Sequence, residues 1–162
     1  MKLKPIHKIL LTTDGSISKI LEAVTGKEIK IETVEQKIVK ADKKVVDILE
    51  IEEGDSVNFR VVNIIADDEI VAHAISYTPL SRLDERFRED LMRADIPIGK
   101  IIKKHNLEVR REINWGNVVK AEKIADIFKI SPDDLILSRN YNIIHRSKIL
   151  INITEYFPLD RF

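Results

Sequence analysis

The final strand-like segment of the chain, INITEYFPL, carries a carboxylate where its pattern predicts an apolar side chain. Alternate residues of a strand lie on one face of a sheet. The residues that alternate with Glu155 are Phe157 and, toward the N-terminus, three isoleucines. That face is therefore expected to be buried, and a carboxylate on a buried face must be paired or have a function.

Two arginines interrupt apolar faces in the same way. Arg60 alternates with apolar residues in NFRVVNI, and Arg139 does so in LILSRNYNII. A guanidinium is rarely buried without a partner. Each arginine is therefore expected to bind either a carboxylate of the protein or a ligand.

Two explanations of these three residues remain open from the pattern alone. In the first, Glu155 forms a buried salt bridge with Arg60 or Arg139, and either partner alone would be strongly destabilising. In the second, a cavity opens on this face. Arg60 then binds a planar carboxylate through two parallel N–H groups, while burial raises the pKa of Glu155 into the range useful for proton transfer. This second arrangement suits a small anionic substrate.

Other kinds of site have little support in the sequence. There is no cysteine, and the four histidines lack metal-ligand spacing, so no metal site is expected. The five glycines form no phosphate-binding loop, and no cofactor is expected. His73 lies in a strand pattern with Val71 and Ile75, and we interpret it as a hydrogen-bonded, partly buried histidine rather than a functional one.

The charge balance argues against nucleic acid as a partner. Basic and acidic residues number 27 each, so the formal net charge is zero, whereas nucleic-acid-binding domains usually carry a basic excess. The pairs Lys103–Lys104 and Arg110–Arg111 are interpreted as solvated surface. No apolar run approaches the roughly 20 residues of a membrane helix, and the N-terminus lacks a signal-peptide core, so we expect a cytoplasmic protein. Frequent Ile, Lys and Glu, with a single Gln, are typical of thermophilic proteins.

The chain contains an internal repeat. Residues 45–80 align with residues 124–159 without a gap, at an offset of 79, and 12 of the 36 positions are identical. Each copy reads as a short helix, a turn, a strand, a polar turn and a second strand that ends at a proline. Two strands joined by a short turn form an antiparallel hairpin. The repeat therefore predicts a duplicated helix-hairpin unit.

The remaining segments complete an α+β domain. Residues 16–26 predict a helix, with Asp14 or Ser16 as its N-cap and Gly26 at its C-terminal end, and about a dozen residues precede it. Two more helices are predicted at residues 81–94 and 97–106, and strands at residues 27–41 and 107–115. We expect one domain over residues 1–162, with a single antiparallel sheet covered by helices.

Four blocks of sequence carry a resemblance to a known family. They are LLTTDGSISKILEAVTG, NFRVVNI, AHAISYTPLSRL followed by IPIGKII, and ITEYFPL. In this order and spacing they resemble the chorismate pyruvate-lyase family, in particular its shorter archaeal and mycobacterial branch. The resemblance spans nearly the whole chain. It implies a single antiparallel sheet with helical lobes that close over a buried ligand cavity, and conversion of chorismate to 4-hydroxybenzoate and pyruvate without a cofactor.

The resemblance also implies roles for particular residues. Arg60 matches the arginine that binds the ring carboxylate, and Glu155 matches the carboxylate near the ring oxygen, the group expected to transfer a proton. Ile98 matches a position whose backbone amide holds the ligand carboxylate, and Ile17 matches a lobe residue that covers the pocket. Chorismate has a second carboxylate, on its enolpyruvyl group. We assign that group to Arg139, an assignment that does not come from the resemblance.

The chain also resembles the effector-binding domains of GntR-type transcription regulators, which share the expected fold. GDSV followed by a strand, the proline after the second strand and the terminal DRF carry this likeness. In that role the pocket binds a small acid or sugar and catalyses no reaction. The short segment before the first predicted helix leaves no room for a DNA-reading helix-turn-helix, which favours the lyase. The sequence leaves open the oligomeric state and the choice between chorismate and a related acid such as isochorismate.

Overall fold

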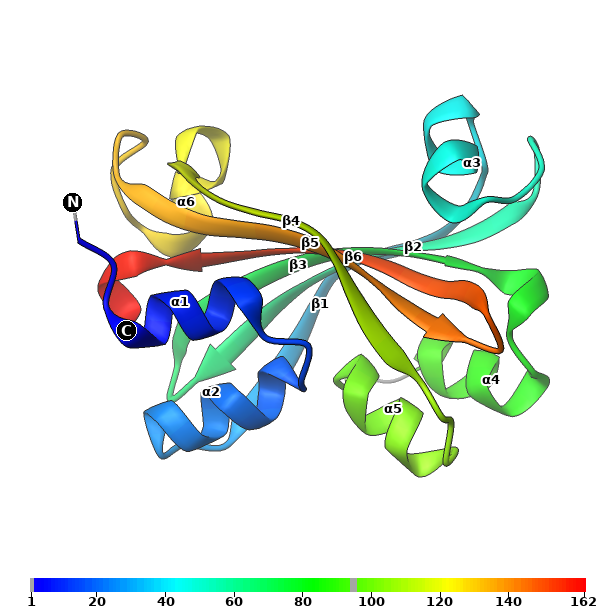
Figure 1. Cartoon of the computed structure of the whole chain (residues 1–162), viewed down its shortest axis with the longest axis horizontal. Helices are drawn as coiled ribbons and strands as arrows, with labels where there is room; N and C mark the ends of the chain where they lie inside the picture. Colours follow the sequence, from blue (N-terminus) through cyan, green and yellow to red (C-terminus); the bar gives the residue numbers. More distant parts are fainter. Residues whose placement is uncertain (1, 94–95) are drawn as a thin grey trace.

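The computed structural model describes residues 2–93 and 96–162 (Figure 1). Its α-helices are α1 (Pro5–Thr12), α2 (Ile17–Thr25), α3 (Lys43–Leu49), α4 (Glu85–Arg93), α5 (Ile98–Lys104) and α6 (Ala125–Phe128). Its strands are β1 (Ile29–Lys40), β2 (Ser56–Ala66), β3 (Glu69–Pro79), β4 (Arg110–Lys120), β5 (Leu135–His145) and β6 (Lys148–Pro158). Short 3₁₀ helices lie at Leu80–Arg82, Glu122–Ile124 and Leu159–Arg161. The predicted α+β class is confirmed.

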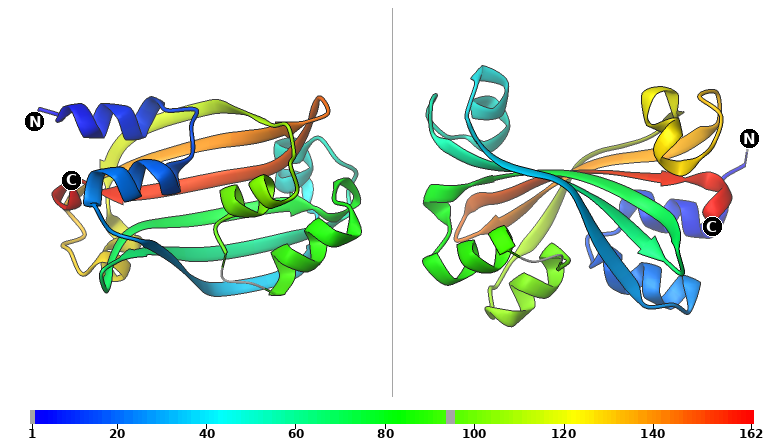
Figure 2. Two further views of the ribbon diagram at one scale, coloured as in Figure 1. Left: turned by 90° about the horizontal axis from the view of Figure 1, so that it is seen from below. Right: turned by 180° about the vertical axis from the view of Figure 1, so that it is seen from behind.

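The strands of the described residues form one six-stranded antiparallel sheet in the order β1-β2-β3-β6-β5-β4. Both predicted hairpins are present, β2 with β3 and β5 with β6, and they meet where β3 pairs with β6. The sheet is strongly twisted. Helices α1, α2, α4 and α5 cover one face, while α3 and α6 lie on the other (Figure 1 and Figure 2). The face covered by four helices is called the inner face below.

Local signals in the sequence account for the ends of several helices. Ser16 is the N-cap of α2, since its hydroxyl accepts a hydrogen bond from the backbone of Lys19 at 3.4 Å. Gly26 ends that helix in the left-handed region, with φ of 67°. Asp42 caps α3 in the same way as Ser16 caps α2, by accepting from the backbone of Val45 at 3.0 Å. Of the two N-caps considered for α2, Ser16 is thus the one that the structure uses.

The two hairpins have the same geometry at their turns. Both turn residues have positive φ in each, 50° and 65° at positions 67 and 68, and 51° and 62° at positions 146 and 147. Turns of this kind match the twist of the flanking strands. Each hairpin also shifts register once, between Ile64 and Ile65 in the first and between Ile143 and Ile144 in the second. These features lie 79 positions apart, the offset of the sequence repeat, although the duplication itself stays a prediction.

Two clusters of apolar side chains pack between the helices and the inner face. One joins Leu10 of α1 and Leu21 of α2 to the sheet. The other joins Phe87 of α4 and Ile101 of α5 to the sheet. Burial of these side chains supplies the main stabilisation of both helical pairs. A pocket, described in the next subsection, lies where the two clusters meet.

Helix α1 was not predicted from the sequence. It begins at Pro5, and Lys4 rather than Ser, Thr, Asp or Asn occupies the N-cap position. The buried His7 accepts a hydrogen bond from the backbone of Lys4 at 3.1 Å, which replaces the usual cap. Proline at the first helical position was the available signal. The helix matters because Leu10 of α1 reaches the candidate site.

Two further predicted ranges differ from the structure. The helix predicted at residues 81–94 begins only at Glu85, because residues 80–82 form a 3₁₀ turn and Asp84 caps α4 by accepting from the backbone of Phe87 at 2.8 Å. Its predicted end at residue 94 lies outside the described residues. The strand predicted at residues 107–115 begins at Arg110 and continues past Gly116 to Lys120. Glycine weakens a strand signal, which is why the sequence prediction stopped early.

Candidate functional site

Four of the five residues selected from the sequence line one pocket. They are Ile17, Arg60, Ile98 and Glu155. The inner face of the sheet forms the floor of the pocket, and the first residues of α2 and α5 form its cover. The fifth residue, Arg139, is fully buried beside Glu155.

The register of the sheet brings Arg60 and Glu155 to the same pocket. Arg60 lies opposite Ser76 across β2 and β3, and Glu155 lies opposite Ala74 across β3 and β6. Ser76 and Ala74 are two residues apart on β3, so their side chains lie on the same face. Because both are small, they leave space between the guanidinium and the carboxyl group.

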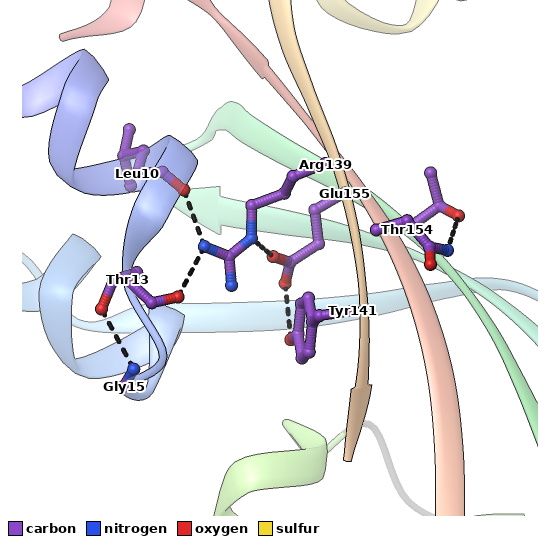
Figure 3. A network of polar contacts seen from close by, with 8 residues as sticks. Leu10, Thr13, Gly15, Arg139, Tyr141, Thr154 and Glu155 are labelled. Carbon is purple, nitrogen blue, oxygen red and sulfur yellow. Dashed lines mark hydrogen bonds and ion pairs between the residues drawn. The ribbon is translucent and has the colours of Figure 1, made fainter. Parts of the chain in front are cut away.

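Glu155 is held by two neighbours on β5 (Figure 3). Arg139 Nε donates to Glu155 Oε1 at 3.1 Å, and the Tyr141 hydroxyl donates to Glu155 Oε2 at 3.1 Å. Burial raises the pKa of the Glu155 carboxyl above its ordinary value, and the charge of Arg139 opposes that rise. Burial also raises the pKa of the Tyr141 hydroxyl. The carboxyl group is therefore fixed in orientation, and burial keeps its pKa above the ordinary value although its neighbours oppose the rise.

Arg139 connects the site to α1. Its Nη1 donates to the backbone carbonyls of Leu10 at 2.8 Å and Thr13 at 2.9 Å (Figure 3). Gly116 lies opposite Arg139 on β4, and a Cβ there would lie 3.2 Å from the carbonyl oxygen of Leu11. Glycine at that position lets the end of α1 approach the sheet closely enough to receive the arginine. Arg139 thus acts as a structural link between α1, β5 and β6.

Arg60 has a different environment. It is 2% exposed and lines the pocket, and its Nη2 donates to the backbone carbonyl of Ile96 at 3.1 Å. Ile96 precedes α5, so this bond ties the cover to the floor on the β2 side. Of the two pairings considered from the sequence, Glu155 thus pairs with Arg139 and not with Arg60.

The cover of the pocket comes from two helix starts. Ile98 and Gly99 are the first residues of α5, where backbone amides have no partner within the helix. Ile17 is the first residue of α2, and its side chain is 5% exposed. A Cβ on Gly99 would lie 3.5 Å from the hydroxyl of Ser16, so the two helix starts are close together.

Arg111 and Tyr141 are among the lining residues that the sequence prediction missed. The interpretation of the Arg110–Arg111 pair as solvated surface is wrong for Arg111, which is half-buried in the pocket wall, although Arg110 is exposed. Arg111 alternates with Ile113 along β4 and so lies on the inner face, while Arg110 lies on the other. That alternation, visible in LEVRREINW, was the available signal.

His73 is a hydrogen-bonded core residue, as predicted. It is buried, and its Nδ1 donates to Asn63 Oδ1 at 2.7 Å. Burial lowers its pKa. His73 is adjacent to the pocket-lining Ala74 on β3, and its side chain therefore points to the opposite face of the sheet.

The described residues contain neither a cluster of metal ligands nor a helix suited to a membrane. Within residues 2–93 and 96–162, no three histidine, aspartate or glutamate side chains gather so that they could hold a metal ion. No helix in that part of the chain combines the length and apolar character needed to cross a membrane.

Asp90 joins α4 to α5 next to the pocket. It is buried. It accepts a hydrogen bond from His105 Nε2 at 2.6 Å, and it forms an ion pair with Lys104 Nζ at 3.0 Å. The hydrogen bonds from Lys104 and His105 lower the pKa of Asp90 to about 2. The carboxylate is therefore ionised at neutral pH, and α4 and α5 are expected to move as one unit.

The pocket is small compared with most ligand sites. Its volume is about 60 Å³, whereas ligand pockets usually enclose roughly 300–1,000 Å³. A ligand with a six-membered ring therefore requires the cover to move away from the floor. The floor is held by the hydrogen bonds of the sheet, so the helices of the cover are the parts expected to move.

Comparisons with known proteins agree on a family. A family model described as Chorismate pyruvate-lyase Rv2949c-like matches residues 11–162. A protein of Methanocaldococcus jannaschii named "Putative lyase MJ0807" is 37% identical over 158 residues, which cover 94% of this chain and 78% of that protein.

Several solved structures share this fold. PhnF from Mycobacterium smegmatis has a TM-score of 0.77 at 14% identity; the match covers 93% of this chain and 66% of PhnF, so this chain spans just under two thirds of that protein. The effector domain of PhnF has a TM-score of 0.74 at 13% identity, and the match covers 93% of this chain and 92% of that domain. A GntR-family transcriptional regulator from Bacillus cereus has a TM-score of 0.65 at 14% identity, and the match covers 83% of this chain and 94% of that structure. At these identities the likeness concerns the fold alone.

Proposed function

Because the chain belongs to the Rv2949c-like chorismate pyruvate-lyase family, we propose that it converts chorismate to 4-hydroxybenzoate and pyruvate without a cofactor. One observation carries the proposal. Arg60 and Glu155, a guanidinium and a carboxyl group with a raised pKa, line the same pocket under two helix starts. These are the two groups that the reaction requires, one to orient an anionic substrate and one to transfer a proton.

Substrate orientation falls to Arg60 in this account. The ring carboxylate of chorismate binds its guanidinium, which can donate two parallel hydrogen bonds to a planar anion. The first backbone amides of α5, at Ile98 and Gly99, supply further donors to the same carboxylate. The ring then lies against apolar side chains of the floor, among them Val62 and Ile153.

Glu155 handles the proton in this account. The bond between the ring and the enolpyruvyl oxygen breaks, the hydrogen on the hydroxyl-bearing ring carbon leaves as a proton, and the methylene carbon of the released enolpyruvate gains a proton. Ring aromatisation drives the reaction, so the enzyme only fixes the conformation, excludes water and assists proton transfer. Neutral Glu155 can protonate the departing oxygen, and the carboxylate that remains can accept the proton that leaves the ring carbon. The released enol of pyruvate then loses its hydroxyl proton to solvent while its methylene carbon takes up a proton from solvent. Arg139 and Tyr141 hold the two oxygens of Glu155 in place for these transfers.

A non-catalytic binding module is the second candidate function. The observation that favours it is the match to the PhnF effector domain, which covers 93% of this chain and 92% of that domain. In this role Arg60 would still bind the carboxylate of a small acid, while Glu155 would accept or donate a hydrogen bond without any reaction.

Product formation distinguishes the two functions. Purified protein in excess over chorismate is expected to release equal amounts of 4-hydroxybenzoate and pyruvate, measured by chromatography against a sample without protein. Excess protein is needed because the cover must open to release product, which can limit turnover. The Arg60→Ala variant should be slower by about 100-fold, since a hydrogen bond to a charged group contributes roughly 1.5–3 kcal/mol.

The matched control is Arg86→Ala, an exposed arginine on α4, which should behave as wild type. If no product forms above the background but chorismate raises the melting temperature of the wild type, the binding module is the better account. Neither product nor stabilisation would contradict both functions.

A further inference from the structure

Arg111 is a second arginine of the pocket with no assigned role. It lies on the edge strand β4, and its side chain is half-buried and lines the pocket. Among residues 2–93 and 96–162 its side chain makes no hydrogen bond or ion pair, and its Nε is buried without a partner. The neighbouring Arg110 differs, since its Nε and Nη2 both donate to Glu112 Oε1, at 3.0 and 2.8 Å.

The unsatisfied state of Arg111 points to a ligand. A guanidinium carries five N–H donors, and leaving the donors of a partly buried cation without acceptors is costly. The charge of Arg111 lowers the pKa of Glu155, but the two side chains form no hydrogen bond or ion pair. Arg139 is paired with Glu155 and bonded to two backbone carbonyls. Within the described residues, the Arg111 side chain thus has no hydrogen-bond acceptor, whereas Arg139 has three and lacks one only at Nη2.

The order of the strands sets Arg111 and Arg60 on opposite sides of Glu155. Arg60 comes from β2, Glu155 from β6 and Arg111 from β4, in the order β2-β3-β6-β5-β4. The guanidinium of Arg111 lies near the start of α5, since a Cβ on Gly99 would be 3.7 Å from its Nη2. The two cations therefore flank the carboxyl group from different edges of the same pocket.

From this geometry we propose that Arg111 binds the second carboxylate of a dicarboxylic substrate, the one on the group that leaves. The inference rests on the proposed function for its choice of chorismate as that substrate. It replaces Arg139 in this role, because Arg139 is occupied by Glu155, Leu10 and Thr13. The ring carboxylate is at Arg60, the enolpyruvyl carboxylate is at Arg111, and the bond that breaks lies between them, beside Glu155.

The proposal predicts a difference between substrate and product. Chorismate has two carboxylates and needs both arginines, whereas 4-hydroxybenzoate has one and needs only Arg60. Once the bond to the ring breaks, the carboxylate bound at Arg111 belongs to pyruvate. Arg111 therefore determines the preference for a dicarboxylic ligand without affecting the affinity for the aromatic product.

The test compares chorismate and 4-hydroxybenzoate in Arg111→Gln and in the matched control Arg110→Gln. Chorismate affinity is measured by calorimetry in the Glu155→Gln background, where turnover is suppressed, and KM is measured in the otherwise wild-type protein. Arg111→Gln should weaken chorismate binding by about 10-fold to 100-fold, the range for a charged hydrogen bond, and change 4-hydroxybenzoate binding by less than about 3-fold. Arg111→Lys should restore part of the loss, because it keeps the charge. Arg110→Gln should change neither ligand.

Equal weakening of both ligands by Arg111→Gln, or weakening of neither, would overturn the proposal. Failure of the proposed function has a different signature. If the wild type forms no product but binds chorismate more tightly than 4-hydroxybenzoate, and Arg111→Gln removes that preference, the lyase activity fails while the role of Arg111 stands. If the wild type binds neither ligand, both fail.

Discussion

Arg60 in β2 and Arg139 in β5 are 79 positions apart, the offset that relates the two hairpin units. Ser76 lies opposite Arg60 on the neighbouring strand, and Glu155 lies opposite Arg139. Those two partners are also 79 positions apart. The two units thus hold the same cation in the same part of a hairpin and differ in the residue opposite it on the neighbouring strand, a serine in one and a glutamate in the other.

In the proposed function, this difference separates a ligand-binding arginine from a structural one. Facing serine, Arg60 stays in the pocket wall, where a ligand can reach it. Facing glutamate, Arg139 turns to its partner and to the backbone of α1. A single position opposite each arginine is therefore expected to decide its role.

The edge strands β1 and β4 carry different residues opposite the two arginines. Gln36 of β1 lies opposite Arg60, and Gly116 of β4 lies opposite Arg139. Gln36 donates to the backbone carbonyl of Met92, at the end of α4, at 2.9 Å. Gly116 has no side chain and lets α1 pack closely. The two edge strands thus anchor different helices, α4 beside Arg60 and α1 beside Arg139.

The largest expected effect is the loss of stability on removing Arg139. The Arg139→Met variant leaves Glu155 buried without its ion-pair partner and leaves the carbonyls of Leu10 and Thr13 without a donor. Breaking a buried pair on one side usually costs about 3–5 kcal/mol, and we expect about 3 kcal/mol less free energy of unfolding in urea titrations. Adding Glu155→Gln should recover part of this loss. A loss below about 1 kcal/mol would show that the pair is not structural.

A carboxylate introduced opposite Arg60 should give Arg60 an ion-pair partner, as Glu155 does for Arg139. The Ser76→Glu variant places the new carboxylate opposite Arg60, where an ion pair would compete with a ligand. We expect 4-hydroxybenzoate to bind about 100-fold more weakly by calorimetry, equivalent to about 2.7 kcal/mol. The control Ser76→Gln has nearly the same volume without the charge, and it should bind more tightly than Ser76→Glu. Equal binding by the two variants would mean that space, not charge, decides the role.

Glu155 should make stability fall as the pH rises, the opposite of buried His73 in the first unit, whose lowered pKa favours folding at higher pH. Burial raises its pKa above the ordinary value of 4.5, so the folded state binds more protons than the unfolded state between the two values. The resulting stabilisation is complete below about pH 4.5 and is lost as the pH rises through the raised value. Urea unfolding from pH 4 to pH 8 should show this decline in wild type and a smaller one in Glu155→Gln. Parallel curves would contradict the raised pKa.

Gly116→Ala should have the smallest effect. The new Cβ would lie 3.2 Å from the carbonyl oxygen of Leu11, so α1 must shift by a few tenths of an ångström. We expect about 1 kcal/mol less free energy of unfolding, the lower end for overpacking. Gly15→Ala is the control, since its Cβ would meet only the Thr13 hydroxyl at 3.4 Å. Equal effects of both substitutions would mean that the approach of α1 to Arg139 is not tight.

Much of the sheet could be predicted from the sequence because its signals are local. The polar turns at positions 67–68 and 146–147 and the alternating strands define both hairpins without reference to the rest of the chain. Because the same pattern occurs in both copies of the repeat, each copy supported the prediction of a hairpin in the other. Helix α1 could not be found in this way, because its cap is made by His7 and its burial depends on the sheet beneath it.

The site could be predicted only as far as the strand pattern reaches. Alternation placed Arg60, Arg139 and Glu155 on apolar faces, but not the register that sets Arg139 directly opposite Glu155. The choice of ion pair depends on strand order and on the backbone of α1, which are properties of the whole fold. Arg111 was hidden because a pair of adjacent arginines is usual on a protein surface.

Turnover by Glu155→Gln tests the central claim most directly. The claim is that the first unit binds the acid through Arg60 and that Glu155 of the second unit transfers the proton. In a single-turnover experiment with chorismate, the variant should form 4-hydroxybenzoate at least about 100-fold more slowly than wild type, the usual contribution of a general acid, while its affinity for 4-hydroxybenzoate stays within about 3-fold. A rate within a few-fold of wild type, with the same affinity, would contradict the account.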